Sequence, residues 1–143
     1  MSVASLDQYL DAVREGDPAK LSATLANDIV MHGPLVSEPI AGRDQVAPVL
    51  GFAFGFVDEF RFGDVLTGPD VFAIPFTGTV GDEELEGMEY LHVDGQGKID
   101  LFTAYIRPLP ALVAFQNKLA PVLGLPAMAL APLPLELSGD DTE

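Results

Sequence analysis

The sequence predicts an α+β domain in which three N-terminal helices cover one face of a curved antiparallel sheet. Apolar residues recur with a helical period up to about residue 57, and they alternate with a period of two from residue 58 to residue 107. The turns between the alternating segments are short. This favours antiparallel hairpins, because a parallel crossover needs about a dozen residues or more. Helices followed by such a meander form a two-layer domain.

The first two helices are predicted from capping signals and spacing. Ser5 and Gln8 form a capping-box pattern. Apolar residues follow at helical spacing, at Leu6, Tyr9, Leu10 and Val13. The turn at residues 16–18 ends this helix, and its proline opens a second, short helix that extends to about Leu25.

A short strand and a third helix are expected next. Residues 29–36 resemble a strand that follows an Asn27-Asp28 turn and is interrupted at Gly33-Pro34. After a loop, the third helix begins near Arg43 and has an apolar face at Val46, Val49, Leu50, Ala53, Phe54 and Val57. Its two glycines, at positions 51 and 55, weaken it by about 1 kcal/mol each relative to alanine. We expect them to admit a closely packed element or to let nearby phenylalanines adapt around a ligand.

Four strands are predicted at about residues 59–67, 71–80, 84–93 and 98–107. Residues 108–124 can form a final helix that is broken at Pro121, so the domain is expected to span 1–124. The tail, 125–143, is apolar and rich in proline before its last six acidic and polar residues, which we expect to be disordered. Prolines exclude a helix interior or a central strand, so the apolar part needs a surface such as a pocket mouth or a partner subunit.

Composition excludes several classes of function. The chain has 22 acidic and 7 basic residues and a net charge of −15, which repels nucleic acid and anionic membrane surfaces. It has no cysteine, and its two histidines lack metal-ligand spacing. Phosphate-binding loops and nucleophile elbows are also missing, so no cofactor is expected. Without a leader-like or membrane-spanning segment, we expect a cytoplasmic protein.

One glutamate lies in an unusual position of the third strand. Leu85, Gly87, Glu89, Leu91 and Val93 face one way, so Glu89 is the only charged group on an apolar face. Burial disfavours the charged form of a carboxyl and raises its pKa, and the neutral form can donate a hydrogen bond. The alternative is that Glu89 pairs with Arg61 or Arg107, or that it lies near a hydrated edge.

Two further side chains are candidates for a site. Tyr9 lies within the apolar stripe of the first helix, where a tyrosine ordinarily finds a local hydrogen-bond partner. His32 precedes the Gly33-Pro34 break, which can direct it toward a ligand, although a lone histidine is more often structural. His92 falls on the face opposite Glu89.

Four segments between residues 5 and 107 resemble the nuclear transport factor 2-like superfamily, which includes ketosteroid isomerases and SnoaL-like polyketide cyclases. They are QYLDAVREGD (8–17), LANDIVMHGPLVSEPIAG (25–42), GMEYLHVDGQGKI (87–99) and TAYIRPL (103–109). The resemblance implies a cone-shaped sheet with helices on its concave face, enclosing a pocket for a small hydrophobic ligand. It also implies that Met31, Gly33, Phe54 and Phe102 line that pocket.

In ketosteroid isomerases the positions of Tyr9 and Glu89 hold an oxyanion-hole tyrosine and a protonated aspartic acid. The resemblance therefore implies that both side chains donate hydrogen bonds to one ligand oxygen. The general base of those enzymes falls at Gly33, which has no side chain. His32 needs a bulge to replace it, and Glu38 in the following loop is a second possible base.

Three functions remain open on the sequence. The first is an isomerase or cyclase that acts on a carbonyl or polyketide-like ligand, and the second is a binding protein that has lost turnover. The third is an epoxide hydrolase, which needs an Asp-Arg-Asp arrangement, but Asp100 and Arg107 show no convincing spacing for it. The resemblance also implies a homodimer, because sheets of this kind commonly pair through the face that helices do not cover. Residues 98–107 support this with bulky groups on both faces: Phe102 and Ile106 on one, Leu101 and Tyr105 on the other.

Overall fold

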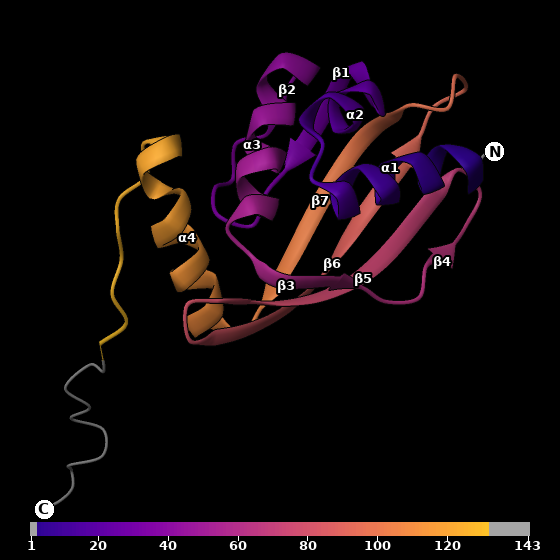
Figure 1. Ribbon diagram of the computed structural model, residues 1–143. Coiled ribbons are helices and arrows are strands. Elements are labelled where there is room, and N and C mark those ends of the chain that lie inside the picture. Colours follow the sequence, from indigo (N-terminus) through magenta and orange to yellow (C-terminus); the bar gives the residue numbers. More distant parts are fainter. Residues whose placement is uncertain (1–2, 132–143) are drawn as a thin grey trace, which may run out of the picture.

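The computed structural model describes residues 3–131, with side chains from Leu6 onward. Over this range the chain forms four helices: α1 (Val3–Glu15), α2 (Pro18–Ala23), α3 (Arg43–Gly55) and α4 (Leu109–Leu123). The strands are β1 (Leu25–His32), β2 (Ile40–Ala41), β3 (Asp58–Phe62), β4 (Leu66–Thr67), β5 (Val71–Val80), β6 (Glu83–Val93) and β7 (Ile99–Arg107). Helices α1, α2 and α3 lie over one face of the sheet, and α4 stands beyond its end (Figure 1).

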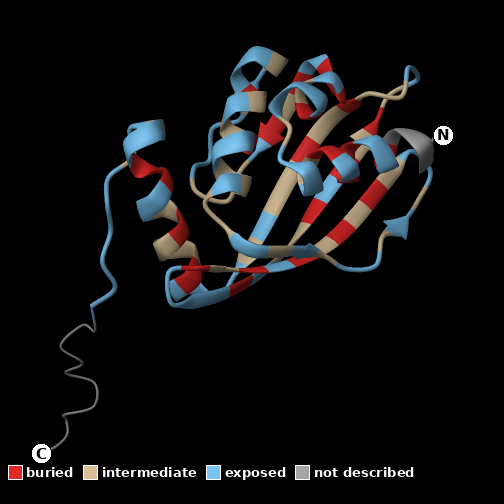
Figure 2. Cartoon of the chain, in the orientation of Figure 1, coloured by how far each residue is buried: buried red, intermediate tan, exposed pale blue. Residues whose placement is uncertain are grey.

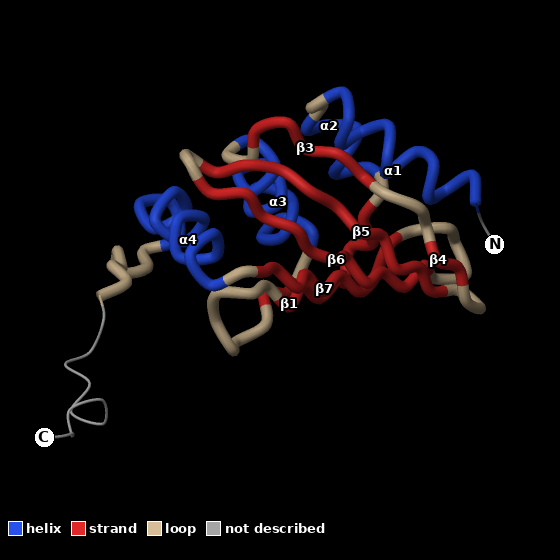
Figure 3. The backbone as a smooth tube through the Cα atoms, turned by 90° about the horizontal axis from the view of Figure 1, so that it is seen from below, coloured by secondary structure: helices blue, strands red, loops and turns tan. Residues whose placement is uncertain are grey.

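The strands form one curved sheet in the order β2-β1-β7-β6-β5-β3, with β4 also paired to β5. In Figure 3 the strands β3, β5, β6 and β7 follow one another across the sheet and bend along their length. The predicted α+β fold is therefore confirmed, with the predicted final helix as the fourth helix. The sheet is mixed rather than wholly antiparallel, because β1 pairs parallel to β7. The long chain between those strands supplies the crossover that a parallel pair requires.

Several predicted boundaries were wrong. Helix α1 begins at Val3, so Ser5 lies inside it instead of capping it. Strand β1 begins at Leu25, and the supposed Asn27-Asp28 turn lies within it, where the pairing with β7 shifts register. Both of these polar residues are exposed there, so the irregularity lets them face solvent without ending the strand.

Other boundaries differ because proline and glycine act at the ends of elements. Strand β1 ends at His32, so Gly33-Pro34 terminates it instead of interrupting it. The predicted strand at 59–67 is divided into β3 and β4. Helix α4 continues through Pro121 to Leu123 and is capped by Gly124, which adopts a left-handed conformation. In α3, nothing approaches a Cβ built on Gly51 or Gly55 within 4 Å, so close packing is not their purpose.

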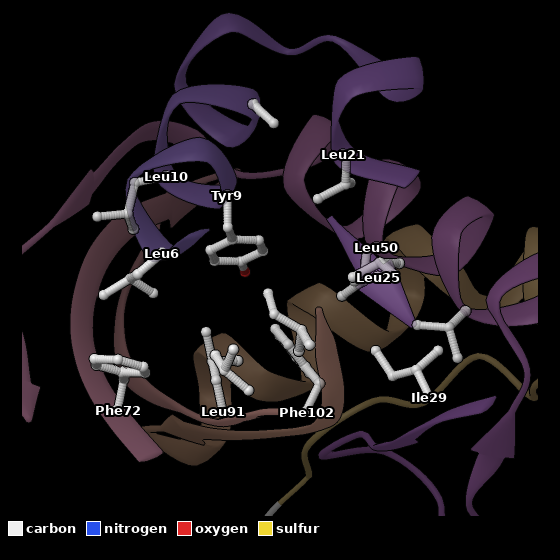
Figure 4. Close-up of a cluster of buried hydrophobic side chains, with 14 of the residues drawn as sticks. Leu6, Tyr9, Leu10, Leu21, Leu25, Ile29, Leu50, Phe72, Leu91 and Phe102 are labelled. Atoms are coloured by element: carbon white, nitrogen blue, oxygen red, sulfur yellow. The ribbon is translucent and has the colours of Figure 1, made fainter. Parts of the chain in front are cut away.

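The core lies between the helices and the concave face of the sheet, where buried positions alternate along the strands (Figure 2). One buried cluster joins α1, α2 and α3 to β1, β5, β6 and β7, and Figure 4 shows its side chains. A second cluster joins α4 to the end of the β5–β6 hairpin through Phe76, Val80, Leu85, Ala111, Phe115 and Leu119. Two clusters of buried side chains therefore cover the concave side of the sheet.

Glycine is required at position 87 on this concave face. Gly87 lies opposite Phe76 in the β5–β6 ladder. A Cβ at position 87 would overlap the ring of Phe76 and the carbonyl oxygen of Tyr105. The missing side chain thus allows the ring of Phe76 to approach the backbone of β6.

The convex face of the sheet carries exposed aromatic groups, including Tyr90 and Tyr105. Between residues 3 and 131, none of the helices is both long and apolar enough to cross a bilayer. In the same range, no three histidine, aspartate or glutamate side chains gather as metal ligands would. The last six residues, which the sequence predicts to be disordered, lie outside the described range.

Candidate active site

Glu89 lies in the middle of β6, a central strand of the sheet, and its side chain faces the helices. Its cross-strand neighbours are Ile74 on β5 and Ala104 on β7. The residue is 1% exposed, and it is the only charged-type side chain that is buried in the described structure. The alternation of β6 thus places a carboxyl group inside the core, as the sequence predicts.

Tyr9 approaches Glu89 from the opposite layer. It lies in α1, is fully buried, and its hydroxyl donates a hydrogen bond of 2.6 Å to Oε1 of Glu89. Figure 4 shows the tyrosine ring extending from α1 toward the sheet residues Leu91 and Phe102. The ring also lies 6.4 Å from that of Phe62. A helix and a strand far apart in sequence are thereby joined by a polar contact inside an apolar core.

Burial changes the ionisation of both groups. Desolvation raises the pKa of Glu89 to about 8, and the hydrogen bond from Tyr9 opposes this rise. The pKa of Tyr9 is raised well above its ordinary value, first by desolvation and then by the neighbouring carboxyl. At neutral pH the carboxyl is therefore mostly protonated, and it can donate a hydrogen bond of its own.

The alternative explanations for Glu89 do not hold. Arg107 forms an ion pair with Glu86, which lies three residues before Glu89 on the exposed face of the same strand. In the described chain, Glu89 forms no ion pair with Arg61 or any other cation. Its depth in the sheet also excludes a hydrated edge.

A cavity adjoins Glu89 on the side away from α1. It has a volume of about 60 Å³ and is bounded by the loop after β1, by α3, by the sheet and by α4. The lining includes all four residues that the resemblance implies: Met31, Gly33, Phe54 and Phe102. Glu89 is the only titratable residue of this lining. The cavity lining is thus hydrocarbon apart from one titratable side chain.

Tyr9 does not line this cavity. The resemblance implies two donors to one ligand oxygen, but the hydroxyl of Tyr9 is hydrogen-bonded to Glu89 itself. In this arrangement the tyrosine holds the carboxyl in place, and the carboxyl alone faces the cavity.

The other candidate residues lie outside the cavity. His32 and Glu38 are both exposed, and neither lines it. The irregularity in β1 falls between Leu25 and Val30, so it does not redirect His32. The structure therefore brings neither of the two candidate general bases to the cavity.

The arrangement needed for an epoxide hydrolase is also not assembled. Asp100 is paired at 2.6 Å with His92, on the opposite side of β6 from Glu89. Arg107 is paired with Glu86, and neither Asp100 nor Arg107 lines the cavity.

Sequence reasoning missed several lining residues. Phe60 and Phe76 line the cavity, and their rings lie 5.2 Å apart. Alternation along the predicted strands was a signal for both. Phe115, Leu119 and Leu123 of α4 also line it. Their spacing of four residues marks one helix face, but nothing local indicates which cavity that face covers.

A curved sheet, helices on its concave side and a buried acid facing an apolar cavity define a class of pocket-containing α+β domains. Residues 6–102 match the family model of the SnoaL-like domain. The chain therefore belongs to the SnoaL-like domain family, within the nuclear transport factor 2-like superfamily.

Known proteins of similar sequence and structure agree with this assignment. The chain is 27% identical over 109 residues to a steroid delta-isomerase of Nocardioides simplex, covering 73% of this chain and 89% of that protein. A steroid delta-isomerase structure from Pseudomonas aeruginosa superposes with a TM-score of 0.81 at 24% identity, covering 85% and 90% of the two chains. An uncharacterised bacterial protein with a cystatin-like fold, from Silicibacter pomeroyi, gives 0.80 at 25% identity, covering 84% and 85%.

Proposed function

We propose that this protein binds a small hydrophobic carbonyl compound and hydrogen-bonds its oxygen through neutral Glu89. The observation that carries the proposal is that Glu89 is the only titratable residue in an otherwise apolar lining. An apolar ligand with one oxygen would satisfy that single polar group and bury the rest of its surface. The names of the two steroid delta-isomerases support a carbonyl ligand of this kind.

The proposed chemistry is stabilisation of an enolate-type oxygen. A hydrogen bond to an oxyanion is roughly twice as strong as one to a neutral carbonyl. A donor fixed in a dry site therefore favours the enolate over the ketone, which is the differential binding that catalysis requires. Tyr9 would serve as a positioning residue, because its hydroxyl fixes Oε1 of Glu89 and leaves the second carboxyl oxygen for the ligand. This is the electrophilic half of an isomerase or cyclase.

A second candidate function is ligand binding without turnover. It is favoured by the cavity lining, which has no titratable group besides Glu89, and by the exposure of His32 and Glu38. An isomerase would need its base from the ligand, from water or from Glu89 itself. The two candidates share the same binding site and differ only in proton transfer.

Titration with phenols tests the shared part of the proposal, because a phenolate resembles an enolate and its ionisation is visible in the ultraviolet spectrum. We expect Glu89→Leu, which removes the donor, to weaken phenol binding by about 10- to 100-fold, since a hydrogen bond to a charged group contributes about 1.5–3 kcal/mol. Glu86→Leu, on the exposed face of the same strand, is the matched control and should leave binding unchanged. Equal binding by the wild type and Glu89→Leu would overturn the proposal.

Turnover is tested separately by NMR. Deuterium exchange at the α-carbon of a bound cyclic ketone, faster than in buffer and lost in Glu89→Gln, would support an enzyme. Exchange at the buffer rate, together with Glu89-dependent phenol binding, would support the binding protein.

A further inference from the structure

One wall of the cavity is formed by helix α4, which comes after the region that matches the family model. The family model ends at residue 102, whereas α4 spans Leu109–Leu123. Phe115, Leu119 and Leu123 of this helix line the same cavity as Glu89. In Figure 1, α4 stands apart from α1, α2 and α3, beyond the end of the sheet. The cavity therefore combines Glu89, which lies inside the matched region, with a wall from α4, which lies after it.

The apolar face of α4 follows from its sequence. Ala111, Phe115 and Leu119 recur every four residues, and all three are buried. They pack against Phe76, Val80 and Leu85 at the end of the β5–β6 hairpin. Apolar side-chain packing thus holds α4 against the sheet.

The chain after α4 is fastened to the other side of the helix. Asn117 accepts a hydrogen bond from the backbone nitrogen of Met128 and donates one to its carbonyl oxygen, each at 2.8 Å. Gln116 donates to the carbonyl oxygen of Pro126 at 2.9 Å. Met128 itself remains 50% exposed. The proline-rich segment therefore lies along α4 and leaves the cavity side of the helix to Phe115 and Leu119.

The size of the cavity makes the position of this wall decisive. Its volume is about 60 Å³, whereas an engineered apolar cavity that binds benzene measures about 150 Å³. A ligand with one or more rings is therefore not contained by the cavity unless a wall yields. Strands β6 and β7 are paired on both sides, and α3 packs against both α2 and β1. The extensive contacts of α4 are all with the strands β5, β6 and β7, and none of them is with another helix.

The geometry points to α4 as the element that sets the size and polarity of the ligand. This inference rests on the proposed function, in which Glu89 holds the ligand oxygen. The ligand class is then a compound with one hydrogen-bonding oxygen at the Glu89 end and only hydrocarbon at the α4 end. A second oxygen at the α4 end would be buried among Phe115, Leu119 and Leu123 without a partner.

The test uses the full chain and a size series of phenols: phenol, 2-naphthol, 17-deoxyoestradiol and oestradiol. We expect Phe115→Ala and Leu119→Ala to raise the affinity ratio of 2-naphthol to phenol by about tenfold or more, because removing a methylene or more from a pocket wall changes discrimination by about 10- to 200-fold. Leu112→Ala is the matched control, because Leu112 lies on α4 and packs in the same cluster but does not line the cavity. It should leave the ratio unchanged.

The polarity of the α4 end is tested by the two steroids. Oestradiol should bind about tenfold or more weakly than its 17-deoxy analogue, since its second hydroxyl would lose hydrogen bonds to water. Phe115→Leu and Leu119→Val replace the alanine variants if those do not fold, and they should shift the size ratio in the same direction.

The outcomes separate the two proposals. If phenols bind in a Glu89-dependent way but the size ratio is the same in the α4 variants and in Leu112→Ala, α4 does not select the ligand and the proposed function stands. Equal affinity for the two steroids would contradict the apolar α4 end. If none of the phenols binds the wild type, the proposed function and the inference about α4 both fail.

Discussion

The hydroxyl of Tyr9 and the carboxyl of Glu89 are separated by 80 residues in the chain and by 2.6 Å in the fold. The contact crosses from α1 to the middle of β6 through apolar side chains. Because both groups are buried, neither can exchange this partner for water without opening the core. The relationship therefore serves stability and site geometry together, and the two roles respond differently to substitution.

Replacing Tyr9 with phenylalanine removes the hydroxyl and leaves the ring. The hydrogen bond from Tyr9 lowers the pKa of Glu89, so we expect that pKa to rise above about 8 in Tyr9→Phe. Leaving a buried oxygen without its partner should also lower the free energy of unfolding by about 1–3 kcal/mol. Carboxyl carbon NMR and urea unfolding measure the two effects. Tyr90→Phe, at an exposed tyrosine, should change neither, and an unchanged Glu89 pKa in Tyr9→Phe would contradict the assignment.

Stability should depend on pH in a way that Glu89 dictates. Its pKa is about 8 in the folded state against 4.5 for an ordinary glutamate, so between these values the folded state holds a proton that the unfolded state releases. The contribution of Glu89 to the free energy of unfolding should therefore fall as pH rises from about 4.5 to about 8, by about 1.4 kcal/mol per unit, and level off outside this window.

The contribution of Glu89 is isolated by subtracting the profile of Glu89→Gln, which cancels the effect of the acidic surface. Urea unfolding from pH 4 to pH 9 supplies both profiles. A flat difference profile would show that Glu89 titrates alike in the two states.

A base can be tested directly at Gly33. A Cβ built there meets only the Met31 Cε, at 3.8 Å, which is an ordinary contact. We expect Gly33→Asp to accelerate conversion of a β,γ-unsaturated cyclic ketone to its conjugated isomer by about 10²- to 10⁴-fold, the usual contribution of a positioned base. Gly33→Asn has the same shape without the base. Equal rates in the two variants would mean that a carboxylate at position 33 does not act as a base on the ligand.

Two glycines should respond to alanine in opposite directions. In Gly87→Ala the new methyl group overlaps the ring of Phe76 and the carbonyl oxygen of Tyr105, so we expect a loss of about 1–3 kcal/mol. In Gly51→Ala the methyl group meets nothing within 4 Å on a helix, and stability should rise by about 0.5–1 kcal/mol. Thermal unfolding of the pair decides this, and a stabilised Gly87→Ala would contradict the packing described here.

The homodimer stays a prediction, and the convex face of the sheet is its expected interface. Tyr105 is 61% exposed there and lies opposite Met88 on the neighbouring strand. We expect Tyr105→Glu to shift sedimentation from dimer to monomer, while Leu66→Glu, at an exposed residue on β4, does not. Because each chain carries a net charge of −15, association should strengthen with added salt. A wild-type monomer at micromolar concentration would refute the prediction.

Patterns along the chain predicted what depends on neighbouring residues. Alternation gave β5 its bounds, Val71–Val80, and placed Glu89 on the buried face of β6. It did not predict the first half of β1, because Asn27 and Asp28 have the composition of a turn and only the pairing with β7 keeps them in a strand. Local propensity was overridden there by a long-range ladder.

The site shows the same division. The burial of Tyr9 and Glu89 was readable from their places on apolar faces. The partner of the Tyr9 hydroxyl depends on how α1 lies across the sheet, so the sequence predicted a shared pocket and missed the direct bond. The contribution of α4 to the cavity likewise depends on the path of the chain after β7.

The parallel pairing of β1 with β7 has a consequence for how the chain folds. One edge of β1 (Leu25–His32) pairs with β2 nearby in sequence, but its other edge is paired only when Leu101 to Thr103 of β7 are present. The amide of Ile99 also bonds to the carbonyl oxygen of Thr24. Contacts of such high sequence separation slow folding, because the intervening loop must close before they form. During synthesis, the edge of β1 that faces β7 therefore stays unpaired until β7 has left the ribosome. The packing of the core residues of β1 is delayed with it.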